Sequence, residues 1–258
     1  MVITSPKNPL LQAVRRAASQ GIPGDEGWVV AEGPHLLDEA LRGTWPIHRI
    51  IATPSACDKW AAPIAQSQAP TTVVDDHAFA ATASTQTAQG ILLLLHPRVF
   101  KWSDLLTGAG LVVVLDELQD PGNAGAIIRS AEAFGAGGVV ITKGSVQIAN
   151  GKLIRAAAGS LFRLPVLDSV PASAAVAELA APKFAIYGLA AGARQSIESA
   201  DLRRPCAFFV GNEGAGLSAP VLAAAQLLRI PTRGVESLNA AIACSIALFE
   251  ASRQRGLA

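Results

Sequence analysis

Apolar runs of strand length alternate with segments of helical periodicity along the chain. The clearest run, residues 111–115, is apolar at every position, which predicts a strand buried on both faces of a parallel sheet. Further strands are expected at residues 28–31, 48–52, 71–74, 91–95, 139–142, 164–167, 184–189, 206–210 and 227–230. Helices are expected at residues 8–19, 34–41, 58–67, 76–83, 152–158, 172–180, 220–225 and 239–253, with one more beginning at Asn123. This alternation is typical of an α/β fold.

The alternation is interrupted once, at residues 98–110, where Trp102 and two glycines follow a proline. We therefore predict a small α/β domain at residues 1–97, a linker at 98–110 and a second domain at 111–258. The second domain is expected to be a doubly wound parallel sheet. Ligands of such sheets bind at the carboxyl ends of the strands.

Composition and charge narrow the function classes. The chain has 258 residues and a net charge of +1. Residues 1–97 hold six Lys/Arg against eight Asp/Glu, and the rest hold fifteen against twelve, so neither part binds nucleic acid by charge alone. No apolar stretch reaches membrane-spanning length and the first residues do not resemble a signal peptide, so we expect a cytoplasmic protein without a membrane partner. Three cysteines and four histidines are scattered without metal-ligand spacing, and we predict no metal.

The most informative stretch follows the predicted strand at 206–210. The chain reads GNEGAG from Gly211 to Gly216, with three glycines in six positions. Such a loop allows its backbone to approach another group closely. A second strand ends at Ile230 before Pro231 and Gly234, and together these strand ends indicate a ligand pocket made of backbone groups. Neither the dinucleotide-binding fingerprint nor a phosphate-binding loop is present.

The helix after residues 120–123 carries a second candidate site. A turn ends at Asn123, which is a suitable N-cap. Ile127, Ala131 and Phe134 form the expected core stripe, with Gly125 and Arg129 on the opposite face. By itself Arg129 is more consistent with a solvated surface side chain than with an anion-binding site. Ser237 and Asn239 are equally consistent with caps of the last helix.

Three stretches occur together and in one order: DPGNxGxxxR at 120–129, GNEGxGLS at 211–218, and IP at 230–231 with ESLN at 236–239. This combination resembles the three signature motifs of the SpoU/TrmH branch of the SPOUT RNA methyltransferases. Weaker matches at residues 3–10, 31–33 and 89–91 resemble that family's L30e-like RNA-binding extension.

The resemblance implies S-adenosylmethionine-dependent methylation of a ribose 2′-hydroxyl in structured RNA, either ribosomal RNA or tRNA, with ribosomal RNA favoured. It also implies a trefoil knot in a methyltransferase domain at 111–258, an RNA substrate-binding domain at 1–97 and a homodimer. The cofactor-binding residues that it implies are Leu189, Gly211, Asn212, Gly214, Ile230 and Leu238. Those implied around the reacting centre are Arg129, Asn123, Glu213, Ser237 and Asn239.

Several alternatives stay open. Arg129 either orients the ribose and its phosphate or activates the hydroxyl, and the first is favoured because an unperturbed guanidinium keeps its proton. On the last helix, Ile242, Ile246 and Phe249 lie either in the core or at a dimer interface. The chain as a whole could be a non-catalytic RNA-binding protein with the same fold. A Rossmann-type nucleotide enzyme is disfavoured by the missing fingerprint.

Overall fold

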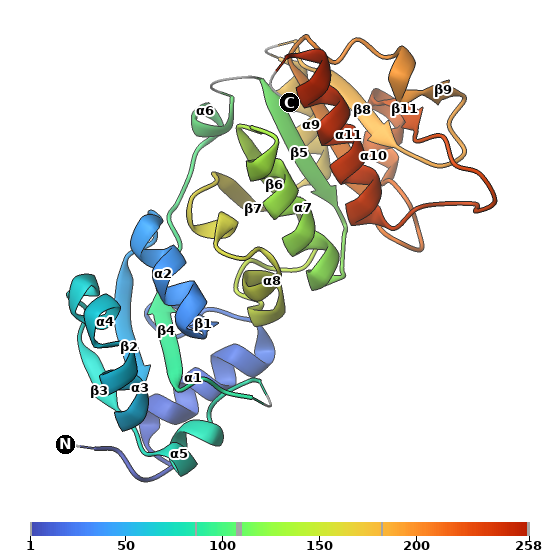
Figure 1. Ribbon diagram of the computed structural model, residues 1–258. Coiled ribbons are helices and arrows are strands. Elements are labelled where there is room, and N and C mark those ends of the chain that lie inside the picture. Colours follow the sequence, from blue (N-terminus) through green and yellow to red (C-terminus); the bar gives the residue numbers. More distant parts are fainter. Residues whose placement is uncertain (1, 86, 107–109, 182, 257–258) are drawn as a thin grey trace. The chain divides into compact units, whose positions relative to one another are not determined.

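The chain folds into two compact units. The computed structural model describes residues 2–85, 87–106, 110–181 and 183–256 (Figure 1). One unit comprises Met1–Arg98 and Ile148–Arg163, and the other comprises Val99–Gln147 and Leu164–Ala258. Residues 148–163, which the sequence assigns to the second domain, therefore pack within the first unit.

The first unit is built on a mixed sheet of four strands. Their order is β1 (Val29–Glu32), β4 (Ile91–Leu95), β2 (Ile47–Ala52) and β3 (Thr71–Val73). β4 runs antiparallel to both β1 and β2, and all five of its side chains are buried. The helices of this unit are α1 (Pro9–Gln20), α2 (Pro34–Arg42), α3 (Pro54–Lys59), α4 (Ala61–Ser67), α5 (Asp76–Ala80) and α8 (Gly151–Ala156), with a 3-10 turn, η1, at Ser160–Phe162.

The single helix predicted at residues 58–67 is wrong, because two short helices occupy this region. α3 begins at Pro54, where Thr53 Oγ1 accepts a hydrogen bond from Ala56 N at 3.2 Å. Trp60, with ψ of 27°, separates α3 from α4. The missed signal was the threonine cap followed by proline, which together favour an earlier helix start.

Side-chain contacts explain why 148–163 belongs to the first unit. Arg163 forms an ion pair with Glu39 of α2, a residue only 9% exposed. Thr44 Oγ1 donates a hydrogen bond to the Phe162 carbonyl at 3.0 Å, and the Phe162 ring packs on Trp45 with centroids 5.3 Å apart. An aromatic contact and a mostly buried charge pair thus hold this crossover segment in place.

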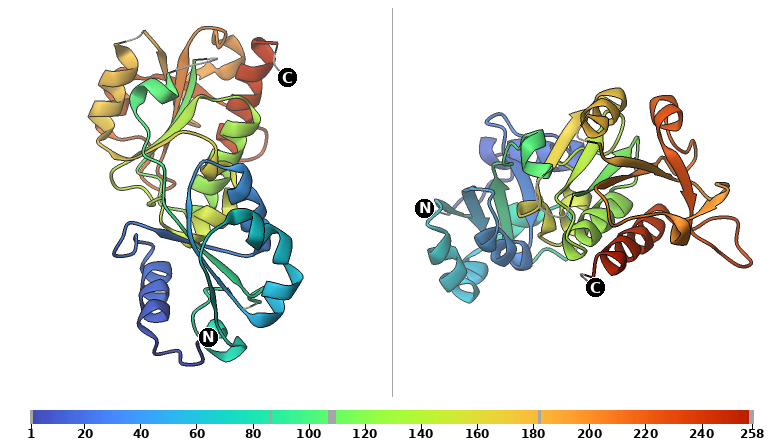
Figure 2. Two further views of the ribbon diagram at one scale, coloured as in Figure 1. Left: turned by 90° about the vertical axis from the view of Figure 1, so that its left-hand side faces the viewer. Right: turned by 90° about the horizontal axis from the view of Figure 1, so that it is seen from above.

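The second unit contains a seven-stranded parallel sheet, which confirms the predicted fold class. Its strands, in spatial order, are β7 (Val166–Val170), β6 (Gly138–Thr142), β5 (Leu111–Asp116), β10 (Cys206–Gly211), β8 (Ala185–Leu189), β11 (Gln226–Arg229) and β9 (Gln195–Ser196). The helices are α6 (Trp102–Leu105), α7 (Pro121–Ala133), α9 (Ala172–Ala180), α10 (Ala219–Ala224) and α11 (Ala240–Gln254), with a 3-10 turn, η2, at Ile197–Ser199. The right-hand view of Figure 2 shows α7 and α11 along one face of this sheet and α9 along the other. The trefoil knot stays a prediction.

The predicted linker is partly regular. It contains α6, whose Leu105 is fully buried in a core formed with Val112, Val114 and Phe209. Residues 107–109 of the linker lie outside the described residues. In the described parts of the chain, no helix combines the length and apolar character needed to cross a membrane.

The last helix, α11, packs against α7. Ser130 and Ser245 share a hydrogen bond of 2.7 Å, and the rings of Phe134 and Phe249 meet with centroids 5.9 Å apart. The buried face of α11 is formed by small and aliphatic residues: Ala241, Cys244, Ala247, Leu248 and Ala251. The core alternative for Ile242, Ile246 and Phe249 is therefore wrong, because these side chains are 53%, 37% and 47% exposed.

Candidate active site

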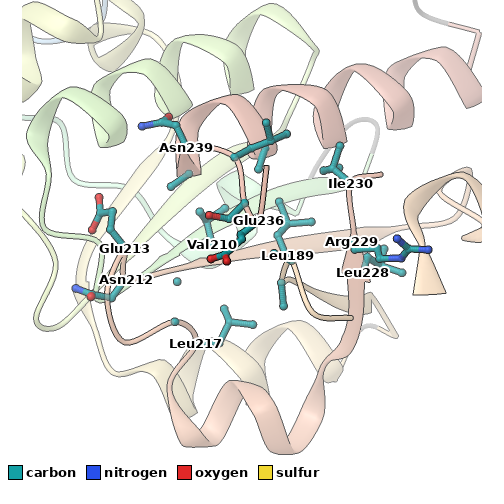
Figure 3. A pocket seen from close by; sticks show the side chains of 18 of the residues that line it. Leu189, Val210, Asn212, Glu213, Leu217, Leu228, Arg229, Ile230, Glu236 and Asn239 are labelled. Atoms are coloured by element: carbon teal, nitrogen blue, oxygen red, sulfur yellow. The ribbon is translucent and has the colours of Figure 1, made fainter. Parts of the chain in front are cut away.

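A cavity of about 780 Å³ opens where β8, β10 and β11 end and α11 begins (Figure 3). This is the edge at which parallel sheets bind their ligands. Asn239 and Glu213 lie at one end of the cavity, and Ile230 and Arg229 lie at the other. All six residues expected to bind the cofactor line it: Leu189, Gly211, Asn212, Gly214, Ile230 and Leu238.

The loop that follows β10 has a shape fixed by its own hydrogen bonds. Asn212 and Gly216 exchange two backbone hydrogen bonds of 2.9 Å. The Asn212 side chain accepts from the N–H groups of Gly214 and Ala215 at 2.9 and 3.0 Å. A Cβ at Gly211 would collide with the backbone of Gly216, so this strand end excludes any side chain. The loop thus forms one wall of the cavity with its backbone.

The opposite wall is the N-terminus of α11. Asn239 caps this helix, since its Oδ1 accepts hydrogen bonds from Ala241 N at 2.9 Å and Ile242 N at 3.3 Å. Its Nδ2 donates to Asn123 Oδ1 at 2.8 Å. Asn123 Nδ2 in turn donates to Glu213 Oε1 at 2.9 Å. The structure therefore joins Asn239, Asn123 and Glu213 in one hydrogen-bonded relay.

The predicted N-cap of α7 is wrong. The cap is Asp120, whose Oδ1 accepts a hydrogen bond from Asn123 N at 2.7 Å, and the helix begins at Pro121. Proline suits the first helical position because no helical partner exists there for an N–H group. With the capping done by Asp120, the Asn123 amide is free to bridge Asn239 and Glu213.

Arg129 lies apart from this relay. It is exposed on α7 and does not line the cavity, and its guanidinium forms no hydrogen bond or ion pair with any residue that the structure describes. Gly125 is buried, which differs from the prediction that it shares the exposed face of Arg129. α7 packs against both the sheet and α11, so more than one of its faces is buried. Ser237 is exposed and lines the cavity.

Two charged residues that line the cavity, Arg229 and Glu236, were not among the predicted site residues, although Glu236 lies within the ESLN motif. Arg229 is the last residue of β11, and a charge that closes an apolar strand was the available signal. Sequence reasoning also missed Asp116, a fully buried carboxylate at the end of β5. Over the described residues, no group of three or more His, Cys, Asp or Glu could hold a metal ion.

The parallel sheet with a glycine-walled cavity at its carboxyl edge defines the second unit as a ligand-binding α/β domain. Comparison with known proteins identifies its family. Residues 110–249 match the model of the SpoU rRNA Methylase family, and residues 24–93 match that of an MRM3-like substrate binding domain. The chain belongs to the SpoU rRNA methylase family, as predicted.

Two relatives resemble the chain over most of its length. An uncharacterized tRNA/rRNA methyltransferase of Synechocystis sp. is 34% identical over 269 residues, covering 98% of this chain and 94% of that protein. The 23S rRNA (guanosine(2553)-2′-O)-methyltransferase RlmP of Bacillus subtilis is 34% identical over 222 residues, covering 84% and 86%. The chain spans only 62% of a second, longer Synechocystis relative, to which it is 36% identical.

Solved structures agree with the fold. The AdoMet-bound rRNA methyltransferase from Sinorhizobium meliloti superposes with a TM-score of 0.86 at 27% identity, covering 98% of this chain and 97% of that one. The matched region includes residues of both units.

Proposed function

We propose that this protein transfers a methyl group from S-adenosylmethionine to a ribose 2′-hydroxyl of structured RNA, ribosomal RNA in preference to tRNA. The observation that carries this proposal is the Asn239–Asn123–Glu213 relay at one end of a glycine-walled cavity. The choice of ribosomal RNA is supported by the Bacillus subtilis relative, which is named for 23S rRNA.

The cavity suits the methyl donor. Leu189, Ile230 and Leu238 supply apolar surface, while Gly211 and Gly214 leave backbone groups accessible. The carboxylates of Glu213 and Glu236 complement a cationic ligand. The AdoMet-bound state of the Sinorhizobium meliloti structure supports this assignment. When bound, S-adenosylmethionine supplies an electrophilic methyl group with a neutral thioether leaving group, so the chain need not provide an acid.

The residues of the relay act on the ribose. A 2′-hydroxyl must be positioned in line with the donor and must lose its proton. Glu213 and Asn239 hold hydrogen-bonding groups at one end of the cavity, and Asn123 fixes the orientation of both. Ser237 lies beside them in the cavity wall. Glu213 orients the hydroxyl as a hydrogen-bond acceptor, and the Asn239 amide and Ser237 hydroxyl are the groups that stabilise charge developing on its oxygen. The proton that the hydroxyl loses passes to solvent water.

Arg129 binds the phosphate next to the target ribose. A planar guanidinium makes two parallel hydrogen bonds to phosphate, which fixes the position of the backbone. The exposure of Arg129 and its free guanidinium, within the described structure, are what binding to a polymeric anion requires.

The protein acts as a homodimer through the exposed face of α11. Ile242, Ile246 and Phe249 form an apolar surface on this helix. The Ser130–Ser245 hydrogen bond places the adjacent turn of α7, which carries Arg129, against α11. A second copy bound to this face would therefore lie close to Arg129.

The first unit binds the RNA substrate in the cytoplasm, where ribosomal RNA is found. Support comes from its match to a model described as a substrate binding domain. Because residues 1–97 are net acidic, contacts with RNA are local and depend on single basic side chains.

The test is to map 2′-O-methyl groups in total RNA from cells that have or lack the gene. We expect one ribosomal ribose to lose its methyl group without the protein and to regain it on complementation. An unchanged methylation map would contradict the proposed activity.

A further inference from the structure

Asp116 is a buried carboxylate next to the cofactor-binding cavity, and neither its sequence context nor the proposed chemistry assigns it a role. We propose that Asp116 is a positioning residue that fixes the shape of the loop from Gly211 to Ser218, the loop that walls the methyl-donor cavity. This inference rests on the proposed function of that cavity.

Among the residues that the structure describes, Ser218 alone forms hydrogen bonds with this carboxylate. Asp116 is fully buried; its Oδ2 accepts a hydrogen bond from Ser218 N at 2.7 Å and its Oδ1 accepts one from Ser218 Oγ at 2.9 Å. No Lys, Arg or His of the described chain forms an ion pair with it. A buried carboxylate without a cation is costly unless hydrogen bonds compensate. The two bonds to Ser218 are therefore the compensation that this position depends on.

Ser218 occupies the N-cap position of α10, yet its side chain does not cap the helix. A serine at this position normally accepts a hydrogen bond from a backbone N–H of the first turn. Here its hydroxyl donates to Asp116 instead. The side chain thus ties the end of the loop to β5 rather than serving α10.

Both ends of the loop meet at Asp116. At the start, Gly211 is the sheet partner of Asp116 in the pairing of β10 with β5. At the end, Ser218 binds the Asp116 side chain. A single residue of β5 thereby closes the loop, and the cavity-lining Gly214, Gly216 and Leu217 lie between its two attachments.

A neighbouring contact reinforces this attachment. Asn212 Nδ2 donates to the carbonyl of Glu117, the residue after Asp116, at 3.0 Å. Glu117 has a positive φ of 57°, and its N–H donates to Thr142 Oγ1 at 3.0 Å. A non-glycine residue with this backbone conformation is held there by its surroundings. The backbone at the end of β5 is therefore rigid where it binds the loop.

The position of Leu217 shows how the attachment reaches the cavity. Leu217 is 8% exposed, and its Cδ1 lies 2.6 Å from where a Cβ would stand at Gly188 of β8. It fits tightly into space that only glycine leaves free. Loss of the hydrogen bonds between Ser218 and Asp116 would loosen the packing of Leu217 and so change the shape of the cavity.

The test is calorimetric titration of the full-length protein with S-adenosylmethionine. We expect Asp116→Ala to weaken binding about tenfold or more and Ser218→Ala to weaken it by about fivefold. The Asp116→Ala/Ser218→Ala double variant should bind no more weakly than Asp116→Ala, because the two residues act through one contact. Asp116→Asn should stay within about threefold of wild type, since an amide can accept from Ser218 N and donate to Ser218 Oγ.

A control separates positioning from general destabilisation. Val139 is buried near the start of β6, at the other end of the sheet from the loop, so Val139→Ala should lower the melting temperature without changing donor affinity. If Asp116→Ala does not fold, Ser218→Ala and Asp116→Asn still decide the question. The positioning role of Asp116 would be overturned, with the proposed function left standing, by either of two results. One is wild-type affinity for S-adenosylmethionine in both Ser218→Ala and Asp116→Ala. The other is an equal loss of affinity in Val139→Ala. A wild-type protein that does not bind S-adenosylmethionine would overturn the proposed function as well.

Discussion

Asn123 Nδ2 donates a hydrogen bond of 2.9 Å to Glu213 Oε1, joining residues 90 positions apart. The contact links the first turn of α7 to the glycine loop after β10. Asn239 extends it to the cap of α11 through a further bond of 2.8 Å. Three segments that are distant in sequence therefore meet at one side of the cavity, and their polar groups are oriented by one another.

Asn123→Asp tests this relay. The substitution removes the amide donor and places a second carboxylate beside Glu213, so the two groups repel. We expect the single-turnover rate of methyl transfer to fall by about 100-fold, which is about 2.7 kcal/mol of barrier. Adding Glu213→Gln restores a donor and an acceptor across the contact and should recover part of the loss. No loss in the single variant, or no recovery in the double, would contradict the relay.

Gly214→Val tests the loop as the cofactor wall. A Cβ at Gly214 would meet only Asn212 Oδ1 at 3.6 Å, so the variant should fold. Its branched side chain would enter the cavity that Gly214 lines and should weaken S-adenosylmethionine binding by about 100-fold or more.

The matched control for Gly214→Val is Gly151→Val. Gly151 lies in the first unit, and a Cβ there would meet only the Arg155 side chain at 3.5 Å. Calorimetry should give wild-type donor affinity for this control. Equal affinities for the two folded variants would remove Gly214 from the cofactor site.

Ile242→Glu tests the dimer. Ile242 is 53% exposed on the apolar face of α11, and a charge there would have to be desolvated on association. Light scattering should give a dimer mass for wild type and a monomer mass for the variant. Val99→Glu is the comparison, because Val99 is 90% exposed and lies outside this face, and it should keep the dimer mass. A monomeric wild-type protein at micromolar concentration would exclude the proposed assembly.

Two buried thiols predict a pH dependence of stability. Burial raises the pKa of Cys206 from 9.0 to about 11 and that of Cys244 to about 12. At pH values between 9.0 and these raised pKa values, the folded protein keeps thiol protons that the unfolded chain releases. The free energy of unfolding is therefore undiminished below pH 9 and falls as the pH rises above it. For Cys206 alone the loss is on the order of 3 kcal/mol.

Denaturant titrations from pH 8 to 11 measure this effect. Cys206→Ala should flatten the decline relative to wild type, whatever its stability at neutral pH. Cys57→Ala, at a position that is only partly buried, should change the slope less. An unchanged slope in Cys206→Ala would contradict the assignment of the decline to this thiol.

The pattern of apolar runs was sufficient to predict the parallel sheet, because strands such as β5 and β10 are buried on both faces and carry an uninterrupted signal. The same pattern could not predict which unit each connecting segment packs in. Residues 148–163 join the first unit through Glu39, Thr44 and Trp45, contacts that have no local signature.

The cavity-lining residues could be predicted because glycines and prolines mark strand ends, and the family motifs gave them functions. The buried face of α11 was harder to predict, because one face of this helix carries small residues and another carries large apolar ones. Packing against α7 at Ser130 selects the small face for burial and leaves Ile242 and Ile246 outside. The role of Asp116 depends on Ser218, which is 102 residues away and could not be paired with it from sequence.

The most direct test of the account is single-turnover methylation by Arg129→Ala. Arg129 is exposed, and substitutions at such positions usually change stability by less than about 0.5 kcal/mol, so the variant should fold and bind S-adenosylmethionine like wild type. Using an RNA that the wild-type protein methylates, we expect no detectable transfer to the ribose. Arg129→Lys should fail too, because an ammonium cannot make the planar two-pronged contact to phosphate. A rate above about a tenth of wild type in Arg129→Ala would leave less than about 1.4 kcal/mol of barrier to this residue and would contradict its proposed role in holding the phosphate next to the target ribose.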